Sequence, residues 1–156
     1  MSMEIHILSD RALDSTAAWQ EAITAHGFAL EFSTALPLSS LRGFLPARSG
    51  GRLTGFECYH DDPAELRLDY HDIDFGRAWA YALSLRWGAR LLECLAVWIA
   101  AAAYAKATDG IVFDPDSSEL LTAQQAIERA REIERELPAI EASLARRDAE
   151  RDDPAS

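Results

Sequence analysis

Cysteine is scarce in this sequence, and the two present have no metal- or haem-binding spacing. Cys58 and Cys94 are the only cysteines in 156 residues. Two thiols are too few for a disulfide framework, and no CxxC or CxxCH pattern occurs. We therefore expect both to be reduced. A chain of this length can bury a sufficient core without disulfides or a structural metal.

Basic residues are also few. The chain has 15 Lys and Arg against 26 Asp and Glu, which gives a formal net charge of −11. Outside the C-terminal segment, where acids are interleaved, no stretch is rich in Lys and Arg. Nucleic-acid binding needs a cationic footprint, so DNA, RNA and anionic membranes are not expected as partners. The charge favours a basic protein surface instead.

Long apolar runs and catalytic signatures are missing too. The most apolar segment, residues 91–107, has only twelve uncharged residues between Glu93 and Lys106, whereas a membrane span needs roughly 20. It is expected to be a buried helix. The N-terminus lacks a basic stretch followed by an apolar one, so a cytoplasmic protein is expected. No phosphate-binding glycine loop and no GxSxG nucleophile elbow occur.

The most unusual segment is "FECYHDDPAELRLDYHDIDF", residues 56–75. It contains seven acidic residues, one arginine and two copies of Tyr-His-Asp. The central "DDPA" is typical of a turn, and the flanking residues alternate in polarity. These features predict a β-hairpin. Its inward residues would be Phe56, Cys58, Leu66, Leu68 and Tyr70.

The hairpin offers weak support for metal or catalytic chemistry. With a turn at residues 61–64, His60 and His71 would lie about six residues, or roughly 20 Å, apart along the ladder. Seven neighbouring acids would disfavour a Cys58 thiolate, and pairs of carboxylates are too common to indicate a glycosidase. We therefore predict no catalytic residue, no metal and no cofactor. The alternative is a small metal-dependent or acid/base enzyme that uses the His60 and His71 region.

The hypothesis that the sequence favours is a non-enzymatic binding protein that docks a basic partner on the acidic hairpin. Carboxylates would provide counter-charge and steering, and tyrosines would provide anchors. The predicted partner-binding residues are Glu57, Tyr59, Asp61, Asp62, Asp69, Tyr70, Asp72 and Asp74.

The rest of the chain predicts an α+β fold. We expect a mainly antiparallel sheet of about five or six strands, packed against a central alanine-rich helix and two further helices. The expected strands lie at 4–9, 28–34, 73–88 and 110–115 in addition to the hairpin, and the expected helices begin near residues 16, 89 and 122. Residues 35–52, rich in Pro, Gly and Ser, are expected to form a long loop.

The final helix carries its own start and stop signals. Thr122 and Gln125 match a capping box, and Pro138 should kink or break the helix. We expect a single domain over residues 1–145 and a frayed polar tail over 146–156.

The segment "WGARLLECLAVWIAAAAYAKATDGIVFDPDSSELL", residues 87–121, resembles a pattern in small bacterial proteins of the polymorphic-toxin immunity type. It shares an aromatic-Gly start, an alanine-rich helix ending in A-x-A-x-A-T-x-G, and a short strand that closes on Asp-Pro. The resemblance covers about a fifth of the chain and transfers no site residues. It implies an immunity protein that neutralises a toxin, and the charge of the chain makes a basic toxin domain the expected target.

Overall fold

Alternation of polarity at the N-terminus produces a central strand of the sheet. In the computed structural model, which describes residues 3–151, β1 (Met3–Ser9) buries Ile5 and Ile7 against one layer of helices. Its other face carries Glu4, His6 and Leu8. The strand has antiparallel neighbours on both sides, β5 (Tyr81–Trp87) and β6 (Ile111–Asp114). The strand predicted at residues 4–9 is confirmed.

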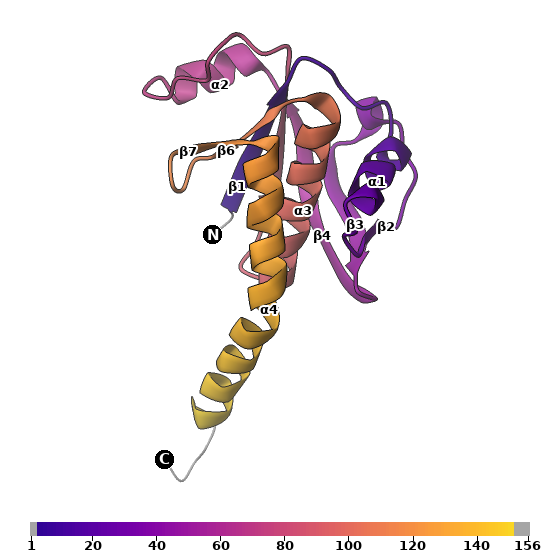
Figure 1. Cartoon of the computed structure of the whole chain (residues 1–156), viewed down its shortest axis with the longest axis vertical. Coiled ribbons are helices and arrows are strands. Elements are labelled where there is room, and N and C mark those ends of the chain that lie inside the picture. Colours follow the sequence, from indigo (N-terminus) through magenta and orange to yellow (C-terminus); the bar gives the residue numbers. More distant parts are fainter. Residues whose placement is uncertain (1–2, 152–156) are drawn as a thin grey trace.

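The described residues form one antiparallel sheet of seven strands, so the predicted fold class is confirmed (Figure 1). The strand order is β2-β3-β4-β5-β1-β6-β7. The strands not yet introduced are β2 (Leu30–Phe32), β3 (Gly43–Ser49), β4 (Arg52–Asp61) and β7 (Glu119–Thr122).

The prediction of a loop over residues 35–52 is wrong for the second half of that segment. Residues 43–49 form β3, which pairs with β4 so closely that Ser49 lies opposite Arg52. Between them Gly50 and Gly51 have φ of 56° and 83°, as a two-residue hairpin turn requires. The glycines therefore mark a tight turn and not an irregular loop. In the first half of the segment, the short 3-10 helix η1 (Leu38–Ser40) precedes β3.

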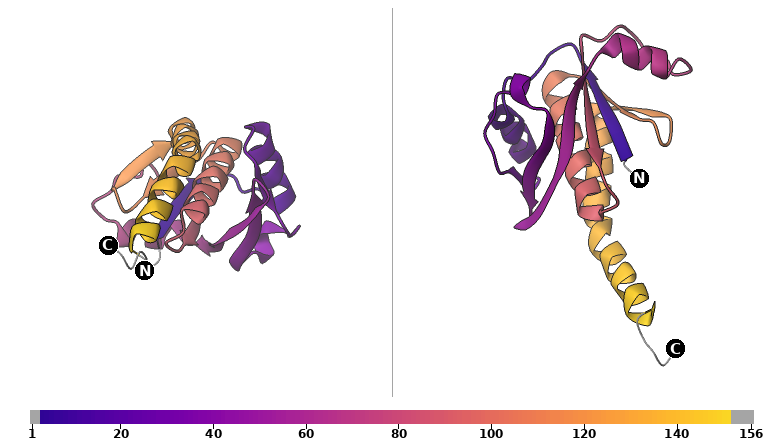
Figure 2. Two further views of the ribbon diagram at one scale, coloured as in Figure 1. Left: turned by 90° about the horizontal axis from the view of Figure 1, so that it is seen from below. Right: turned by 180° about the vertical axis from the view of Figure 1, so that it is seen from behind.

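Three helices cover one face of the sheet (Figure 2). They are α1 (Thr16–Ala25), α3 (Leu91–Thr108) and α4 (Ala123–Arg151). A short helix, α2 (Pro63–Asp69), packs at one end of the opposite face, where Leu66 joins Leu8, Ala82 and Phe113 in a small second apolar cluster. Most of that face has no helix over it.

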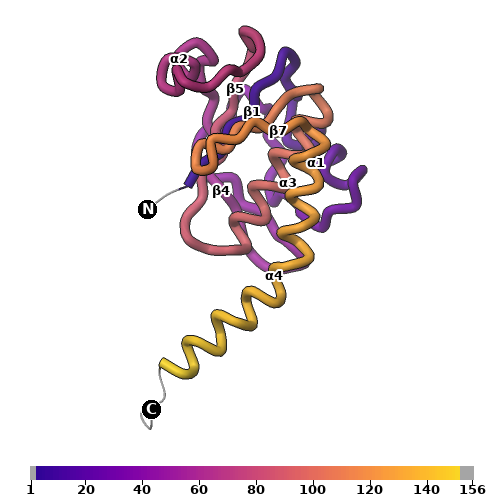
Figure 3. Tube along the Cα trace, turned by 60° about the vertical axis from the view of Figure 1, so that its left-hand side comes forward, coloured from indigo at the N-terminus to yellow at the C-terminus, as the bar shows by residue number. Residues whose placement is uncertain are grey.

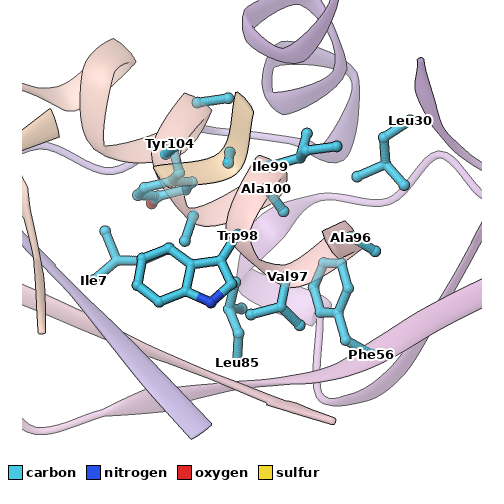
Figure 4. Close-up of a cluster of buried hydrophobic side chains, with 14 of the residues drawn as sticks. Ile7, Leu30, Phe56, Leu85, Ala96, Val97, Trp98, Ile99, Ala100 and Tyr104 are labelled. Atoms are coloured by element: carbon cyan, nitrogen blue, oxygen red, sulfur yellow. The ribbon is translucent and has the colours of Figure 1, made fainter. Parts of the chain in front are cut away.

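The alanine-rich helix α3 is the centre of the core (Figure 4). Its residues from Leu95 to Ala105 are all buried, and they lie between the sheet, α1 and α4. The small side chains of Ala100 to Ala103 allow close approach, and the Trp19 indole N–H of α1 donates to the Ala100 carbonyl oxygen at 2.8 Å. Among residues 3–151, α3 is the one helix long and apolar enough to cross a membrane, but most of it is buried in this core.

The final helix begins as its sequence predicts. The Gln125 N–H donates to Thr122 Oγ1 at 3.1 Å, and the Thr122 N–H donates to Gln125 Oε1 at 2.9 Å, which is the reciprocal capping box. The helix continues through Pro138 to Arg151 and changes direction partway, so that its second half leaves the body of the protein (Figures 1 and 3). Arg52 forms two hydrogen bonds of 3.0 Å with Glu141 where the helix departs.

The predicted frayed tail over residues 146–156 stays a prediction. Residues 146–151 are helical, and residues 152–156 lie outside the described residues.

The packing of α4 on α3 gives a direct test of the core. Ala126 and Ala130 of α4 are completely buried and share one helix face. We expect Ala130→Leu to lower the free energy of unfolding by about 1–3 kcal/mol, because extra methylene groups overpack the interface. Urea denaturation would measure the change. The exposed Ala145→Leu is the control and should change stability by less than about 0.5 kcal/mol; equal effects of the two substitutions would contradict this packing.

Candidate functional site

The acidic segment 56–75 does not form the predicted hairpin. Its first half is the end of β4, but residues 63–69 form α2. Asp62 caps this helix by accepting a hydrogen bond from the Ala64 N–H at 2.9 Å, and Pro63 occupies the first turn. Asp-Pro is thus a helix start here and not a hairpin turn. The helical period also explains why Leu66 is buried, whereas Leu68, predicted to point inward, is 76% exposed.

The strand partners of β4 come from elsewhere in the chain. β4 lies between β3 and β5, so the residues on its outer face have neighbours far away in sequence. The predicted residues Glu57, Tyr59 and Asp61 all lie on this outer face. The Tyr59 hydroxyl donates to Glu57 Oε1 at 2.9 Å, and the Arg86 guanidinium of β5 lies 5.0 Å from the centre of the Tyr59 ring.

The remaining predicted residues divide into two groups. Asp62, Asp69 and Tyr70 lie at the two ends of α2. Asp72 and Asp74 lie in the loop that follows, where Asp72 is 89% exposed beside His71 and Asp74 accepts from the Gly76 N–H at 2.8 Å. The loop residues therefore face solvent and are separate from the cavity beneath α2.

A small cavity of about 130 Å³ lies between α2 and the outer face of the sheet. We call it the acidic pit. Five carboxylates line it, with Arg86 as the one cationic side chain. The pit-lining residues are Glu4, His6, Asp61, Asp62, Glu65, Leu66, Asp69, Tyr70, Ser84 and Arg86.

Sequence reasoning found only part of this pit. Asp61, Asp62, Asp69 and Tyr70 were predicted as partner-binding residues, but Glu4, His6, Glu65, Ser84 and Arg86 were not. The alternation in residues 4–9 does indicate that Glu4 and His6 face away from the main core. The missing information was the strand order, which brings β1 beside β5 and β5 beside β4.

A buried polar cluster forms one wall of the pit. His6 is only 4% exposed, and its Nδ1 lies 3.0 Å from Ser84 Oγ. The Ser84 hydroxyl also donates to Asp61 Oδ2, which lies 3.5 Å from His6 Nδ1. Aromatic rings fix the imidazole in place, with Phe113 stacked on it and Tyr70 edge-on.

This cluster does not have the geometry of a nucleophilic triad. In a triad, one imidazole nitrogen contacts the nucleophile and the other contacts the carboxylate. Here both Ser84 and Asp61 lie on the Nδ1 side of His6. Ser84 is also 1% exposed, so its hydroxyl is closed to a substrate. The arrangement is better suited to positioning charge than to attacking a carbonyl.

The electrostatics of the pit follow from its acids. Burial opposes ionisation of Asp61, but hydrogen bonds from His6 and Ser84 hold the pKa of its carboxyl below the ordinary value. The pKa of the Tyr70 hydroxyl is raised, first by burial and then by the negative charges of Glu4, Asp69 and Asp61. The lowered pKa keeps Asp61 ionised, so it contributes a negative charge to the pit.

A second, larger cavity of about 440 Å³ opens at the adjoining end of the sheet. Asp14, Arg42, His60 and Tyr81 face it, and Asp61 separates it from the acidic pit by lining both. The His60 Nε2 atom is 2.8 Å from the Leu38 carbonyl oxygen. His71 lines neither cavity, so the structure does not bring the two histidines into one site. Within residues 3–151, no group of three or more His, Cys, Asp or Glu side chains is arranged to hold a metal ion.

The structure makes both thiols poor nucleophiles. Burial, reinforced by the Asp61 charge, raises the pKa of Cys58 to about 12, and burial with the Asp114 charge raises the pKa of Cys94 to about 11. We expect both to react with a disulfide reagent at pH 8 about a hundredfold or more slowly than a free thiol, because the thiolate is the reactive form. Both should react rapidly in denaturant. Fast labelling of native Cys58, located by mass spectrometry, would contradict this assignment.

The Asp61 cluster predicts an acid-dependent part of the stability. A lowered folded-state pKa means that ionised Asp61 stabilises the fold fully above its ordinary pKa of 3.8, and that this contribution is lost as the pH falls through the lower folded-state value. We expect Asp61→Asn to cost about 1–3 kcal/mol at pH 7. It should also flatten the decline in stability as the pH falls below about 4, because the loss begins near the ordinary pKa and continues through the lower folded-state value.

Urea denaturation across this pH range would measure both effects. The exposed Asp72→Asn is the control and should leave the pH 7 stability and the acid decline unchanged. If Asp61→Asn showed the same acid decline as the wild type, the cluster would not be the source of the pH dependence.

Comparison with known proteins does not supply a function. Searched against protein-family models, curated proteins and solved structures, the chain has no significant match. Its function therefore has to be inferred from the placement of its own residues.

Proposed function

We propose that this chain is a protein-binding module that docks a basic surface of a partner protein on its acidic face. The acidic face consists of α2 with the adjacent strand ends and loop, and its carboxylates belong to Glu4, Asp61, Asp62, Glu65, Asp69, Asp72 and Asp74. The observation that carries the proposal is the acidic pit, where five carboxylates meet a single guanidinium. Such a concentration of one sign of charge steers a partner of the opposite sign and fixes its orientation.

Several of these acids are unpaired. Glu65 and Asp69 are exposed on α2 and form no ion pair or side-chain hydrogen bond with any described residue. Asp62 uses its side chain to cap the helix. Unneutralised carboxylates on a short helix repel one another, and a cationic partner would relieve that repulsion.

The charge of α4 gives an informative contrast. Residues 123–151 contain seven acids and six arginines, whereas residues 56–75 contain seven acids and one arginine. The acids of α4 alternate with arginines along the helix, as in a solvated surface that neutralises itself. More than half of the negative charge excess is therefore concentrated in residues 56–75 and is not spread over the whole chain.

The resemblance of residues 87–121 to immunity proteins suggests the kind of partner. We propose a toxin domain whose cation-lined cleft is covered by the acidic face. Tyr59 and Tyr70 lie beside the pit and supply aromatic surface of the type that anchors interfaces. Partners of this kind are consistent with the net charge of −11.

The larger cavity favours a second candidate function. Its volume of about 440 Å³ lies in the range of small-ligand pockets, and Asp14, Arg42, His60 and Tyr81 place polar groups around its apolar floor. A small-ligand or acid/base site here would use His60 without His71. The enzyme alternative therefore concerns this cavity and His60, and no longer includes His71.

The proposal is tested with two charge-matched variants. The first, which we call the α2 variant, replaces Glu65 and Asp69 of α2 and Asp72 and Asp74 of the following loop by Gln or Asn. It leaves the cluster of His6, Ser84 and Asp61 unchanged. The second, the α4 variant, replaces Glu128, Glu132, Glu134 and Glu136 of α4 by Gln. These positions are exposed, and the net charge changes by the same amount as in the α2 variant. Wild type and both variants are used as bait in a lysate of the source cells, and the affinity for the captured protein is then measured.

We expect wild type and the α4 variant to capture the same basic protein, and the α2 variant to bind it at least about tenfold more weakly. The affinity should also fall as salt is raised, because exposed charges are screened. Equal binding by both variants, or an acidic captured partner, would contradict the proposed interface.

A further inference from the structure

Hydrogen bonds fix the walls of the larger cavity to one another. The N–H of Leu38 in η1 donates to the Asp14 carbonyl oxygen at 2.9 Å, and the Leu38 carbonyl oxygen lies 2.8 Å from His60 Nε2 at the end of β4. The Leu13 N–H donates to the hydroxyl of Tyr104 on α3 at 3.2 Å. The loop after β1, η1, β4 and α3 are therefore held together by the protein itself. A preformed pocket has less to order when it binds a ligand.

The floor of this cavity is apolar. Leu38, Ala82, Leu83 and Tyr104 line it and are buried, and Tyr81 adds a half-exposed aromatic ring to the lining. The volume of about 440 Å³ is at the small end of the range for ligand pockets, about 300–1,000 Å³. These properties suit a small molecule with a compact apolar body, because its binding would remove apolar surface from water.

The lining also contains two opposite charges without partners. Arg42 and Asp14 both line the cavity and are exposed. Neither side chain forms an ion pair or a hydrogen bond with any residue in the described range 3–151. Asp61 is different, because its carboxylate accepts a hydrogen bond from Ser84. The cavity therefore presents one unpaired guanidinium and one unpaired carboxylate beside an apolar floor.

We propose that this cavity binds a small zwitterion with an apolar body, of the class of free α-amino acids with large apolar side chains. The ligand carboxylate pairs with the Arg42 guanidinium, whose planar fork matches carboxylate geometry. The ligand ammonium pairs with the Asp14 carboxylate, and the ligand side chain occupies the apolar floor. This inference rests on the second candidate function, the small-ligand site, and it is independent of the docking of a basic partner.

Ligands without both charges fit this lining less well. An anion would pair with Arg42 but would lie beside the negative charges of Asp14 and Asp61. A cation would leave the guanidinium without a partner. A neutral apolar molecule would take water away from both charges and offer no compensation. A zwitterion is the class that satisfies both unpaired groups while it fills the apolar space.

The test is a titration of the folded full chain, labelled with ¹⁵N, with defined small molecules. The first probe is L-phenylalanine. It is compared with L-phenylalaninamide, which lacks the carboxylate, and with N-acetyl-L-phenylalanine, which lacks the ammonium. L-leucine is a second apolar zwitterion, and glycine is a zwitterion without an apolar body. The assigned backbone amide shifts give the dissociation constants and show where each probe binds.

The variants remove the two charges of the cavity one at a time. They are Arg42→Gln and Asp14→Asn. The matched controls are Arg48→Gln and Asp72→Asn, which remove the same charges at exposed positions that do not line the cavity. All four side chains are exposed, so we expect every variant to fold as the wild type does, and the amide spectrum without ligand checks this.

We expect phenylalanine and leucine to shift amide signals of the cavity lining and glycine to have no effect. Loss of either charge from phenylalanine should weaken binding about tenfold or more, because each removes a charge-assisted hydrogen bond. Arg42→Gln should weaken the binding of phenylalanine by a similar factor but leave that of the amide unchanged. Asp14→Asn should do so for phenylalanine but not for the N-acetyl derivative. Both control variants should bind as the wild type does.

The outcomes separate the ligand class from the site. If phenylalanine, its amide and its N-acetyl derivative bind the cavity equally, the zwitterion is wrong and the cavity remains a small-ligand site. If a control variant weakens phenylalanine as much as Arg42→Gln does, the assignment of the charges is wrong. If no probe binds at about 10 mM, a weak affinity even for a small ligand, both the ligand class and the small-ligand function are contradicted. The docking function is decided independently by the α2 variant.

Discussion

Close packing around the small residues of α3 is the constraint on which the fold depends. The helix is covered by the sheet on one side and by α1 and α4 on the others, and a helix in such a position must be apolar on all sides. Alanine meets this demand with the least volume, so neighbouring elements approach closely. Trp19 fills the remaining space on the α1 side and satisfies its indole N–H at the Ala100 carbonyl oxygen. Because this layer protects only one face of the sheet, the opposite face had to be stabilised in another way.

The second face is stabilised at one end by α2 and by a polar cluster. The Asp61, Ser84 and His6 side chains share hydrogen bonds across three adjacent strands, and His6 and Ser84 are buried. A partly buried carboxylate loses some of its hydration, and hydrogen bonds offset that cost. The network supplies these hydrogen bonds to Asp61, whereas His6 Nε2 has no hydrogen-bond partner among residues 3–151. Around this cluster the pit has five carboxylates and one guanidinium, so its charge is mostly negative.

The charged residues are distributed differently on α4 and in residues 56–75. On α4, arginines alternate with acids, and one arginine on β4 anchors the helix through Glu141. In residues 56–75, by contrast, seven acids are accompanied by a single arginine, Arg67. The same residue types therefore produce a self-compensated surface on α4 and a surface with uncompensated negative charge around α2.

The sequence by itself determined the elements whose signals are local. The alternation of residues 4–9, the capping box of Thr122 and Gln125 and the apolar length of α3 each depend on neighbours a few positions apart, and each was predicted correctly, as was the α+β class. Signals with two local meanings were misread. Asp62-Pro63 starts a helix as well as a turn, and Gly50-Gly51 marks a hairpin as well as a loop. Only the tertiary structure decided the site, because strand order and register depend on contacts between residues far apart in the chain. Asp61 could be nominated from its own acidic segment, but its hydrogen bonds with Ser84 and His6 exist only because β1, β5 and β4 lie side by side.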